Sequence, residues 1–202
     1  MYWARAKREL ARADPVMRAV IRRHPHAQLS SRGDPFQTLA RSIVGQQISV
    51  RAAQTVWEKV NARLPAVTPA HTLEAGHANL LACGLSRRKA EYLLDLAAHF
   101  VSARIAPGRW QAMNDDAVIA ELVEVRGIGR WTAEMFLIFS LLRPDVLPVD
   151  DLGLQRAVSL SYRDGRKVTE AGLRRIAKVW QPWRSVATWF LWRSLDPVPV
   201  EY

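Results

Sequence analysis

Two adjacent carboxylates in the second half of the chain are the residues best suited to chemistry. Asp150 and Asp151 follow Pro148 and precede Leu152, after a long apolar segment. An aspartate in such a place either caps the helix that follows or presents a negative charge to a reacting atom. The pattern predicts that one of the two is a helix cap and leaves open which one.

A turn with two glycines precedes these carboxylates. Gly127 and Gly129 flank Ile128 between two segments with helical spacing. Glycine allows positive φ and lets another backbone come close. The second helix is expected to begin near Arg130, so that N–H groups from Gly127 to Thr132 point outward, where they suit a phosphate. Ile128 is expected to hold the turn on the core, and contacts of this kind position a duplex without reading its sequence.

A third segment contains paired glutamines. Gly45 is expected to end one helix, and Ser49 to cap the next. Between them, Gln46 and Gln47 either cap the first helix or extend from an exposed loop. The residue types alone do not decide between these two interpretations.

Together, these segments resemble the helix-hairpin-helix (HhH-GPD) superfamily of base excision DNA glycosylases. The hairpin sequence is 125–134, the Gly/Pro-Asp sequence is 148–156, and the Gly-Gln-Gln-Ile-Ser loop is 45–49. Within the superfamily, the chain is most similar to the 3-methyladenine DNA glycosylase II group. The resemblance covers about 34–192, with the three motifs in the expected order.

The resemblance implies that Asp151 is catalytic, because the family's aspartate matches the second of the pair, 20 residues after Trp131. A carboxylate there stabilises the oxocarbenium-like state of glycosidic cleavage and orients or deprotonates water. Trp131 stands where bifunctional relatives have a Schiff-base lysine. No lysine lies between Lys89 and Lys167. We therefore expect a monofunctional enzyme without AP-lyase activity.

The resemblance also implies a base pocket. Trp192 matches an aromatic residue that stacks on the extruded base, and a cationic base over an indole gains about 1–2 kcal/mol when desolvated. Met135 stands where one branch of the family has tyrosine, which leaves the lesion range open. Trp131 and Asp150 complete the predicted pocket.

A base must leave the duplex to reach such a pocket, and another group must fill the gap. By resemblance, Gln47 is the intercalating residue. The other residues expected to bind DNA are Gln46, Ser49, Gly127, Gly129, Arg130 and Thr132. The family's hairpin also holds a monovalent cation, Na⁺ or K⁺, which here would be bound by the backbone carbonyls of Val123, Val125 and Ile128.

Composition agrees with a nucleic-acid partner. The chain has 29 Lys and Arg against 19 Asp and Glu, a net charge of +10, which attracts polyanions, although an arginine excess also arises from a GC-rich genome. The single Cys83 excludes an internal disulfide and a four-cysteine iron–sulfur site. We expect double-stranded DNA with damaged bases as partner, a monomer, no required cofactor and no membrane. We also expect a bacterial, cytoplasmic, nucleoid-associated protein without a signal peptide.

The spacing of apolar residues predicts an all-α fold. The expected helices are 15–23, 36–44, one from Ser49, a short one from Thr68, 87–103, 114–125, 130–142, 154–161, 169–180 and 184–194. The resemblance implies two helical lobes with an active-site cleft between them. One is a six-helix lobe, 34–142, with the hairpin at about 114–142, and the other combines 1–33 with 143–202 and carries Asp151.

The leading interpretation is a monofunctional glycosylase that flips and excises 3-methyladenine and 7-methylguanine. One alternative is a glycosylase of the same fold for ethenoadenine, hypoxanthine or uracil. Another is a protein that binds damaged DNA without turnover. A structural helical protein with incidental basicity is a third, which predicts no salt-dependent DNA affinity.

Overall fold

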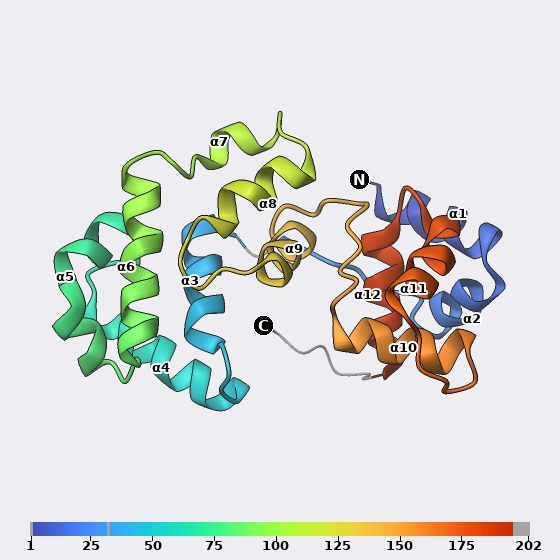
Figure 1. Ribbon diagram of the computed structural model, residues 1–202, viewed down its shortest axis with the longest axis horizontal. Helices are drawn as coiled ribbons and strands as arrows, with labels where there is room; N and C mark the ends of the chain where they lie inside the picture. The colour runs from blue at the N-terminus through green and yellow to red at the C-terminus, as the bar shows by residue number, and fades with distance from the viewer. Residues whose placement is uncertain (1, 32, 196–202) are drawn as a thin grey trace. The chain divides into compact units, whose positions relative to one another are not determined.

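The computed structural model describes residues 2–31 and 33–195, and within those ranges it contains helices and no β-strand (Figure 1). The predicted all-α fold is therefore confirmed. In the described part of the chain, no helix is both long and apolar enough to cross a membrane.

The described residues form two compact units. We call residues 33–136 the hairpin unit, and residues 2–31 with 137–195 the carboxylate unit. The division falls before Leu137, whereas the family resemblance implies a boundary after residue 142. The hairpin unit contains α3 (Pro35–Gly45), α4 (Val50–Arg63), α5 (Pro69–Ala82), α6 (Arg87–Val101), α7 (Pro107–Trp110), α8 (Asp115–Val123) and most of α9 (Arg130–Phe139). The carboxylate unit contains α1 (Trp3–Ala13), α2 (Pro15–Arg23), α10 (Leu152–Tyr162), α11 (Glu170–Ile176), the 3₁₀ helix η1 (Ala177–Trp180) and α12 (Arg184–Leu195).

Several helices begin at a residue whose side chain caps the first turn. Asp14 and Asp34 each accept backbone N–H groups of the first helical turn and are followed by proline at the first helical position. Ser49 and Ser86 cap α4 and α6 in the same way. Because these bonds join residues two or three positions apart, the starts of these helices can be predicted from the sequence.

Other elements differ from the expectation. Helix α1 is not among the expected helices, because its N-cap, Tyr2, makes no side-chain cap bond. The sequence feature that indicates this helix is the spacing of three residues that are buried in the structure, Trp3, Ala6 and Leu10. Residues 107–110, which lie outside the expected helices, form the short helix α7. The helix from Pro69, expected to be short, runs to Ala82 and is interrupted at Gly76, where φ is 67°. Helix α6 ends at Val101 rather than near residue 103.

Helix α9 ends at Phe139, although apolar residues continue to Leu142. Leu142 has a left-handed backbone, with φ of 52°, and the N–H of Arg143 donates to the carbonyl of Leu137. The predicted helix 169–180 is split into α11 and η1, a tightening that α-helix ends commonly show. Apolar spacing predicts burial but not the residue at which helical hydrogen bonding stops.

A buried aspartate, Asp14, links three elements of the carboxylate unit. Asp14 caps α2 through Oδ1, while its Oδ2 accepts hydrogen bonds from the Tyr162 hydroxyl at 2.7 Å and the Trp180 indole at 3.0 Å. Burial and the neighbouring Asp14 raise the pKa of Tyr162. One carboxylate therefore connects α2, α10 and η1.

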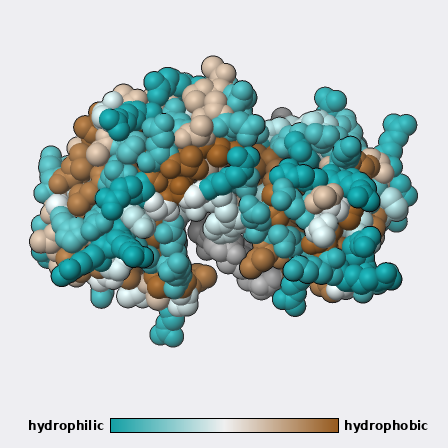
Figure 2. All heavy atoms as spheres, viewed as in Figure 1, coloured by the Kyte–Doolittle hydropathy of each residue, from teal (hydrophilic) through white to brown (hydrophobic). Residues whose placement is uncertain are grey.

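In the hairpin unit, α6 packs against both α5 and α3. Its buried side chains Leu93 and Leu96 belong to a core that also contains Leu39, Ile43 and Leu122. Hydrophilic side chains cover much of the visible surface in Figure 2. The apolar spacing of the helices is thus satisfied inside each unit.

Candidate active site

Asp151 is the member of the carboxylate pair that caps a helix. Its Oδ1 accepts a hydrogen bond from the backbone N–H of Leu154 at 2.6 Å, at the start of α10, and from the indole N–H of Trp192 at 2.7 Å. The residue is 8% exposed, while Asp150 is exposed. The two donors to one oxygen restrict the rotation of the carboxyl group. The side chain that caps α10 is therefore also a carboxylate held in a fixed orientation, as chemistry on a substrate would require.

Trp192 is held in place by a second aromatic ring. Its indole stacks on Phe139, with centroids 5.6 Å apart and planes at 13°. Gly153 gives the indole room, because a Cβ there would be 3.1 Å from Asp151 Oδ1 and 3.2 Å from Trp192 Nε1. Since Phe139 occupies one face of the indole, a base could stack only on the other face.

The segment that leads to Asp151 is fixed from α12 and α10. Arg184 binds the carboxylate of Asp145 through two nitrogens, at 2.7 and 2.9 Å. The N–H of Val146 donates to the Ser185 hydroxyl at 2.9 Å, and the Gln155 amide donates to the carbonyl of Val149 at 2.8 Å. The backbone before Asp151 is therefore held on both sides, which keeps the carboxylate where α10 begins.

Gly127 has the positive φ that the sequence predicts, and the group that comes close to it is the side chain of Tyr92. The φ of Gly127 is 87°, and a Cβ would lie 2.2 Å from Cδ2 of Tyr92. Ile128 is 4% exposed, as expected of a residue that holds the turn on the core. Glycine is required at Gly127 for two independent reasons, a left-handed backbone and contact with an aromatic ring.

Gly129 is different, because a Cβ there would have no heavy atom within 4 Å. The first α9 hydrogen bond runs from the Ala133 N–H to the Gly129 carbonyl. The N–H of Ile128, however, donates to the carbonyl of Val125 inside the turn, so it does not point outward as predicted. The N–H groups suited to a phosphate begin at Gly129, where the backbone is open to approach.

Arg130 is engaged by the chain's own acids. Its guanidinium lies 3.1 Å from the buried Glu134 and 3.3 Å from the exposed Asp116. The side chain is thus directed along α9 and toward α8. A phosphate would have to replace or share these carboxylates to use its charge.

The glutamine loop (residues 45–49) has an exposed tip. Gln47 is exposed with φ of 59°, and the neighbouring Ile48 is 42% exposed. Ser49 caps α4 by accepting from the N–H of Ala52. Gln46 is the C-cap residue of α3, where its backbone N–H donates to the carbonyl of Ile43, while its side-chain amide donates to the carbonyl of Gly127 at 2.8 Å. Sequence reasoning placed Gln46 at the DNA, and the structure joins it to the glycine turn.

The carbonyls predicted to hold a cation lie around the same turn. The Val125 carbonyl accepts the Ile128 N–H at 3.0 Å, which leaves it able to accept or coordinate a second partner. Val123 is the last residue of α8, and Ile128 is the apex of the turn. Carbonyls at a helix end and in a turn are chemically suited to a monovalent cation.

The remaining predicted pocket residues lie on α9. Trp131 is 39% exposed in the first turn, whereas Met135 is 9% exposed. Thr132 is half-buried between them. The structure therefore brings Asp151 and Trp192 into contact in the carboxylate unit and Gln46 and Gly127 into contact in the hairpin unit.

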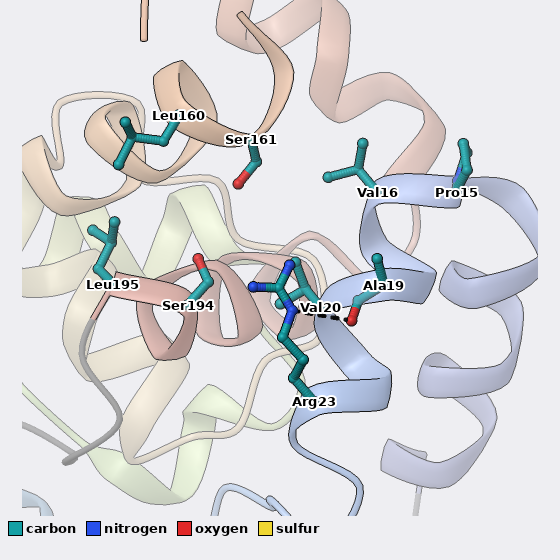
Figure 3. A pocket seen from close by; sticks show the side chains of 9 residues that line it. All are labelled: Pro15, Val16, Ala19, Val20, Arg23, Leu160, Ser161, Ser194 and Leu195. Carbon is teal, nitrogen blue, oxygen red and sulfur yellow. Dashed lines mark hydrogen bonds between the residues drawn. The ribbon is translucent and has the colours of Figure 1, made fainter. Parts of the chain in front are cut away.

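A separate hollow of about 510 Å³ lies in the carboxylate unit between α2, α10 and α12. In Figure 3, Arg23 extends into it from α2, facing Ser161 and Ser194. The other described lining residues are apolar, and none of the predicted site residues is among them. This hollow is distinct from the Asp151–Trp192 contact.

Comparison with known proteins decides the family. The model of the HhH-GPD superfamily of base excision DNA repair proteins matches residues 40–182. The chain belongs to this family. That match includes the glutamine loop, the glycine turn and Asp151, so the family resemblance drawn from the sequence is confirmed.

Individual relatives support the assignment to one branch of the family. The chain is 32% identical over 168 residues to a DNA-3-methyladenine glycosylase of Schizosaccharomyces pombe, covering 80% of this chain and 72% of that one. It is 28% identical to one of Bacillus subtilis, of whose length it spans 66%. A solved S. pombe 3-methyladenine DNA glycosylase in complex with abasic DNA superposes with a TM-score of 0.83 at 26% identity, covering 98% of both chains. One from Bacillus halodurans gives 0.81 at 32% identity, covering 91% of this chain and 90% of that one.

Sequence reasoning missed Phe139 and Gly153, which position Trp192 against Asp151. A glycine two residues after a capping aspartate was a readable signal, because glycine disfavours the interior of a helix. Phe139 gave no such signal, since it lies in an apolar run in which every residue has the same character.

Proposed function

We propose that this protein is a monofunctional DNA glycosylase that hydrolyses the N-glycosidic bond of 3-methyladenine in double-stranded DNA. The observation that carries the proposal is the carboxylate of Asp151, held by the Leu154 N–H and the Trp192 indole. The names of the relatives, DNA-3-methyladenine glycosylases, supply the substrate class. Family membership supplies the reaction class, base excision repair.

In this proposal, Asp151 acts on the sugar and water. As the N-glycosidic bond breaks, its electron pair goes to the cationic base, which leaves neutral, and the anomeric carbon gains positive charge. The carboxylate stabilises that charge, and water adds to the carbon and loses a proton to Asp151 or to solvent. The products are the free base and an intact abasic site.

The substrate range includes 7-methylguanine, because both bases carry a positive charge when methylated at a ring nitrogen. The exposed face of Trp131 and the indole of Trp192 are electron-rich surfaces, which attract a cation more strongly than a neutral base. Met135 stands where one branch of the family has tyrosine, which leaves open a second candidate, a glycosylase of the same fold that excises ethenoadenine, hypoxanthine or uracil.

The enzyme has no AP-lyase activity, since Trp131 replaces the amine that would attack the sugar. We expect no protein–DNA adduct on borohydride treatment. Trapping at a level that matches base release would contradict this part of the proposal.

The protein acts as a monomer on DNA that contains damaged bases, associated with the nucleoid in the bacterial cytoplasm. It requires no cofactor and has no iron–sulfur cluster. The carbonyls of Val123, Val125 and Ile128 hold Na⁺ or K⁺. The DNA-bound structure of the S. pombe enzyme supports the choice of partner.

The deciding experiment measures which bases are released from methylated genomic DNA by the wild type and by Asp151→Ala. Release of 3-methyladenine and 7-methylguanine by the wild type alone supports the proposal. Release of other bases from a panel of lesion duplexes would favour the second candidate. Tight binding without release from any lesion would instead identify a protein that only binds damaged DNA.

A further inference from the structure

The glutamine loop and the glycine turn are 81 residues apart in the chain, yet one hydrogen bond joins them. The Gln46 side-chain amide donates to the Gly127 carbonyl at 2.8 Å, and both residues are only part-exposed. This bond connects the loop that carries Gln47 with the turn suited to a phosphate. Both belong to the hairpin unit.

The peptide group between Gly127 and Ile128 is held at both ends. Its N–H donates to the carbonyl of Val125 at 3.0 Å, and its carbonyl accepts the amide of Gln46. A peptide group bonded at both ends cannot rotate without breaking one of the bonds. Gln46 therefore fixes the orientation of the Gly127–Ile128 peptide, which is followed by the peptide that carries the N–H of Gly129, where the backbone is open to approach.

Helix α6 contacts both of these segments. Lys89, Tyr92 and Asp95 are spaced three apart and share a face of the helix. Lys89 Nζ donates to the carbonyl of Val44 at 2.7 Å, at the end of α3, while Asp95 accepts the N–H of Arg126 at 2.8 Å. Tyr92 packs on Gly127. Helix α6 thus fixes the base of each segment, and Gln46 is a direct bond between the segments.

The backbone at the tip of the glutamine loop is in an unfavourable conformation. Gln47 has φ of 59°, a left-handed backbone that an L-residue other than glycine adopts at a cost. Gln46 is the residue immediately before it. The bond to Gly127 therefore restrains the strained tip at its N-terminal side.

We propose that Gln46 is a positioning residue that couples the Gln47 tip to the phosphate-binding turn, rather than a residue that contacts DNA. This inference rests on the proposed function. With the bond intact, insertion of Gln47 and binding of the phosphate occur as one event. Without it, each segment still forms, but extrusion of the base becomes slower.

The test uses Gln46→Met, which keeps the length of the side chain, adds no charge and removes the donor. The matched control is Gln111→Met, the same change at an exposed residue after α7 in the same unit. Thermal unfolding is measured for both variants. Single-turnover release of a methylated purine is then measured from duplexes in which the lesion is paired or mispaired.

We expect Gln46→Met to slow release from the paired duplex about fivefold, the loss typical of one neutral hydrogen bond. Release from the mispaired duplex should change much less, because a mispaired base is already easy to extrude. Gln111→Met should match the wild type on both duplexes. An equal loss on paired and mispaired duplexes would overturn the proposal, as would no loss at all.

A double-mutant cycle with Gln47→Ala separates coupling from general damage to the fold. If Gln46 acts through the tip, the double variant should be no slower than Gln47→Ala alone. Additive losses would mean that Gln46 acts independently of Gln47, which contradicts the proposal.

Binding to a duplex with a stable abasic-site analogue provides a readout without catalysis. Gln46→Met should weaken this binding more than binding to an undamaged duplex. If the wild type releases no base, the proposed function fails while this comparison still tests the coupling. If the wild type releases bases but Gln46→Met binds both duplexes normally, the coupling alone is wrong.

Discussion

The two units of the molecule differ in net charge and in the chemical groups that they present. The described hairpin unit has 11 Lys and Arg against 10 Asp and Glu, while the carboxylate unit has 17 against 7. The unit with the proposed phosphate-binding turn is thus nearly neutral, and the N–H groups that it offers to a phosphate begin at Gly129. The carboxylate unit carries the surplus positive charge and holds Asp151 and Trp192, the side chains that we propose for chemistry.

In the proposed function, the surplus positive charge and the specific phosphate site therefore belong to different units. A surplus of charge attracts DNA without orienting it, whereas backbone N–H groups at a helix start act over short distances and in fixed directions. Changes in the hairpin unit should therefore alter binding and folding. Changes around Asp151 should alter the rate of base release.

The largest expected effect is that of Asp151→Asn. We expect base release to fall by about a thousandfold, because a charged group that stabilises the transition state is lost while the cap oxygen remains. DNA affinity should survive, measured by fluorescence anisotropy beside single-turnover rates. Asp164→Asn, an exposed residue in a turn, is the control and should keep full activity. Release by Asp151→Asn at the wild-type rate would refute the catalytic assignment.

The two glycines of the hairpin provide the next test. Gly127→Ala should destabilise the protein by about 1–3 kcal/mol, because alanine would have to adopt a left-handed backbone and its Cβ would overlap the Tyr92 ring. Gly129→Ala should leave the melting temperature unchanged, since its Cβ would meet open space, but weaken binding to duplex DNA several-fold. Equal melting temperatures for the two variants would show that the Gly127 packing is wrong.

A smaller effect is expected from Trp192→Phe, which removes the indole donor to Asp151 and keeps an aromatic ring on Phe139. Base release should slow about tenfold, the effect of losing a hydrogen bond to a charged group. Trp183→Phe is the matched control, because its indole N–H also bonds a carboxylate, that of Glu9, in the same unit. A loss of similar size in both variants would indicate general destabilisation rather than positioning of Asp151.

The smallest effect concerns alkaline stability of the carboxylate unit. The pKa of Tyr162 is raised above its ordinary value of 10.0 by burial and by Asp14, so the folded state holds its proton where the unfolded state has lost it. Stability should therefore fall as pH rises above about 10. In Tyr162→Phe the fall of melting temperature between about pH 9 and 11 should be shallower, even if the variant is less stable at neutral pH. An unchanged slope would exclude Tyr162 as its source.

The sequence by itself determined the short-range features of this protein. Side-chain caps such as Asp14, Asp34 and Ser49 bond to N–H groups two or three residues away, so their helix starts could be predicted from local order. The positive φ of Gly127 and the burial of Ile128 could also be predicted, because both depend on the residue types within one short turn. The family could be predicted because its motifs are contiguous segments.

Only the tertiary structure decided which side chains meet. The sequence left the capping role open between Asp150 and Asp151, and the bond from Trp192 to Asp151 depends on the packing of α12 against α10. Gln46 and Gly127 are 81 residues apart, and local pattern carries no information about such a contact. Distant residues become partners when the apolar faces of their helices are buried together, because that burial fixes where each polar side chain can find a hydrogen bond.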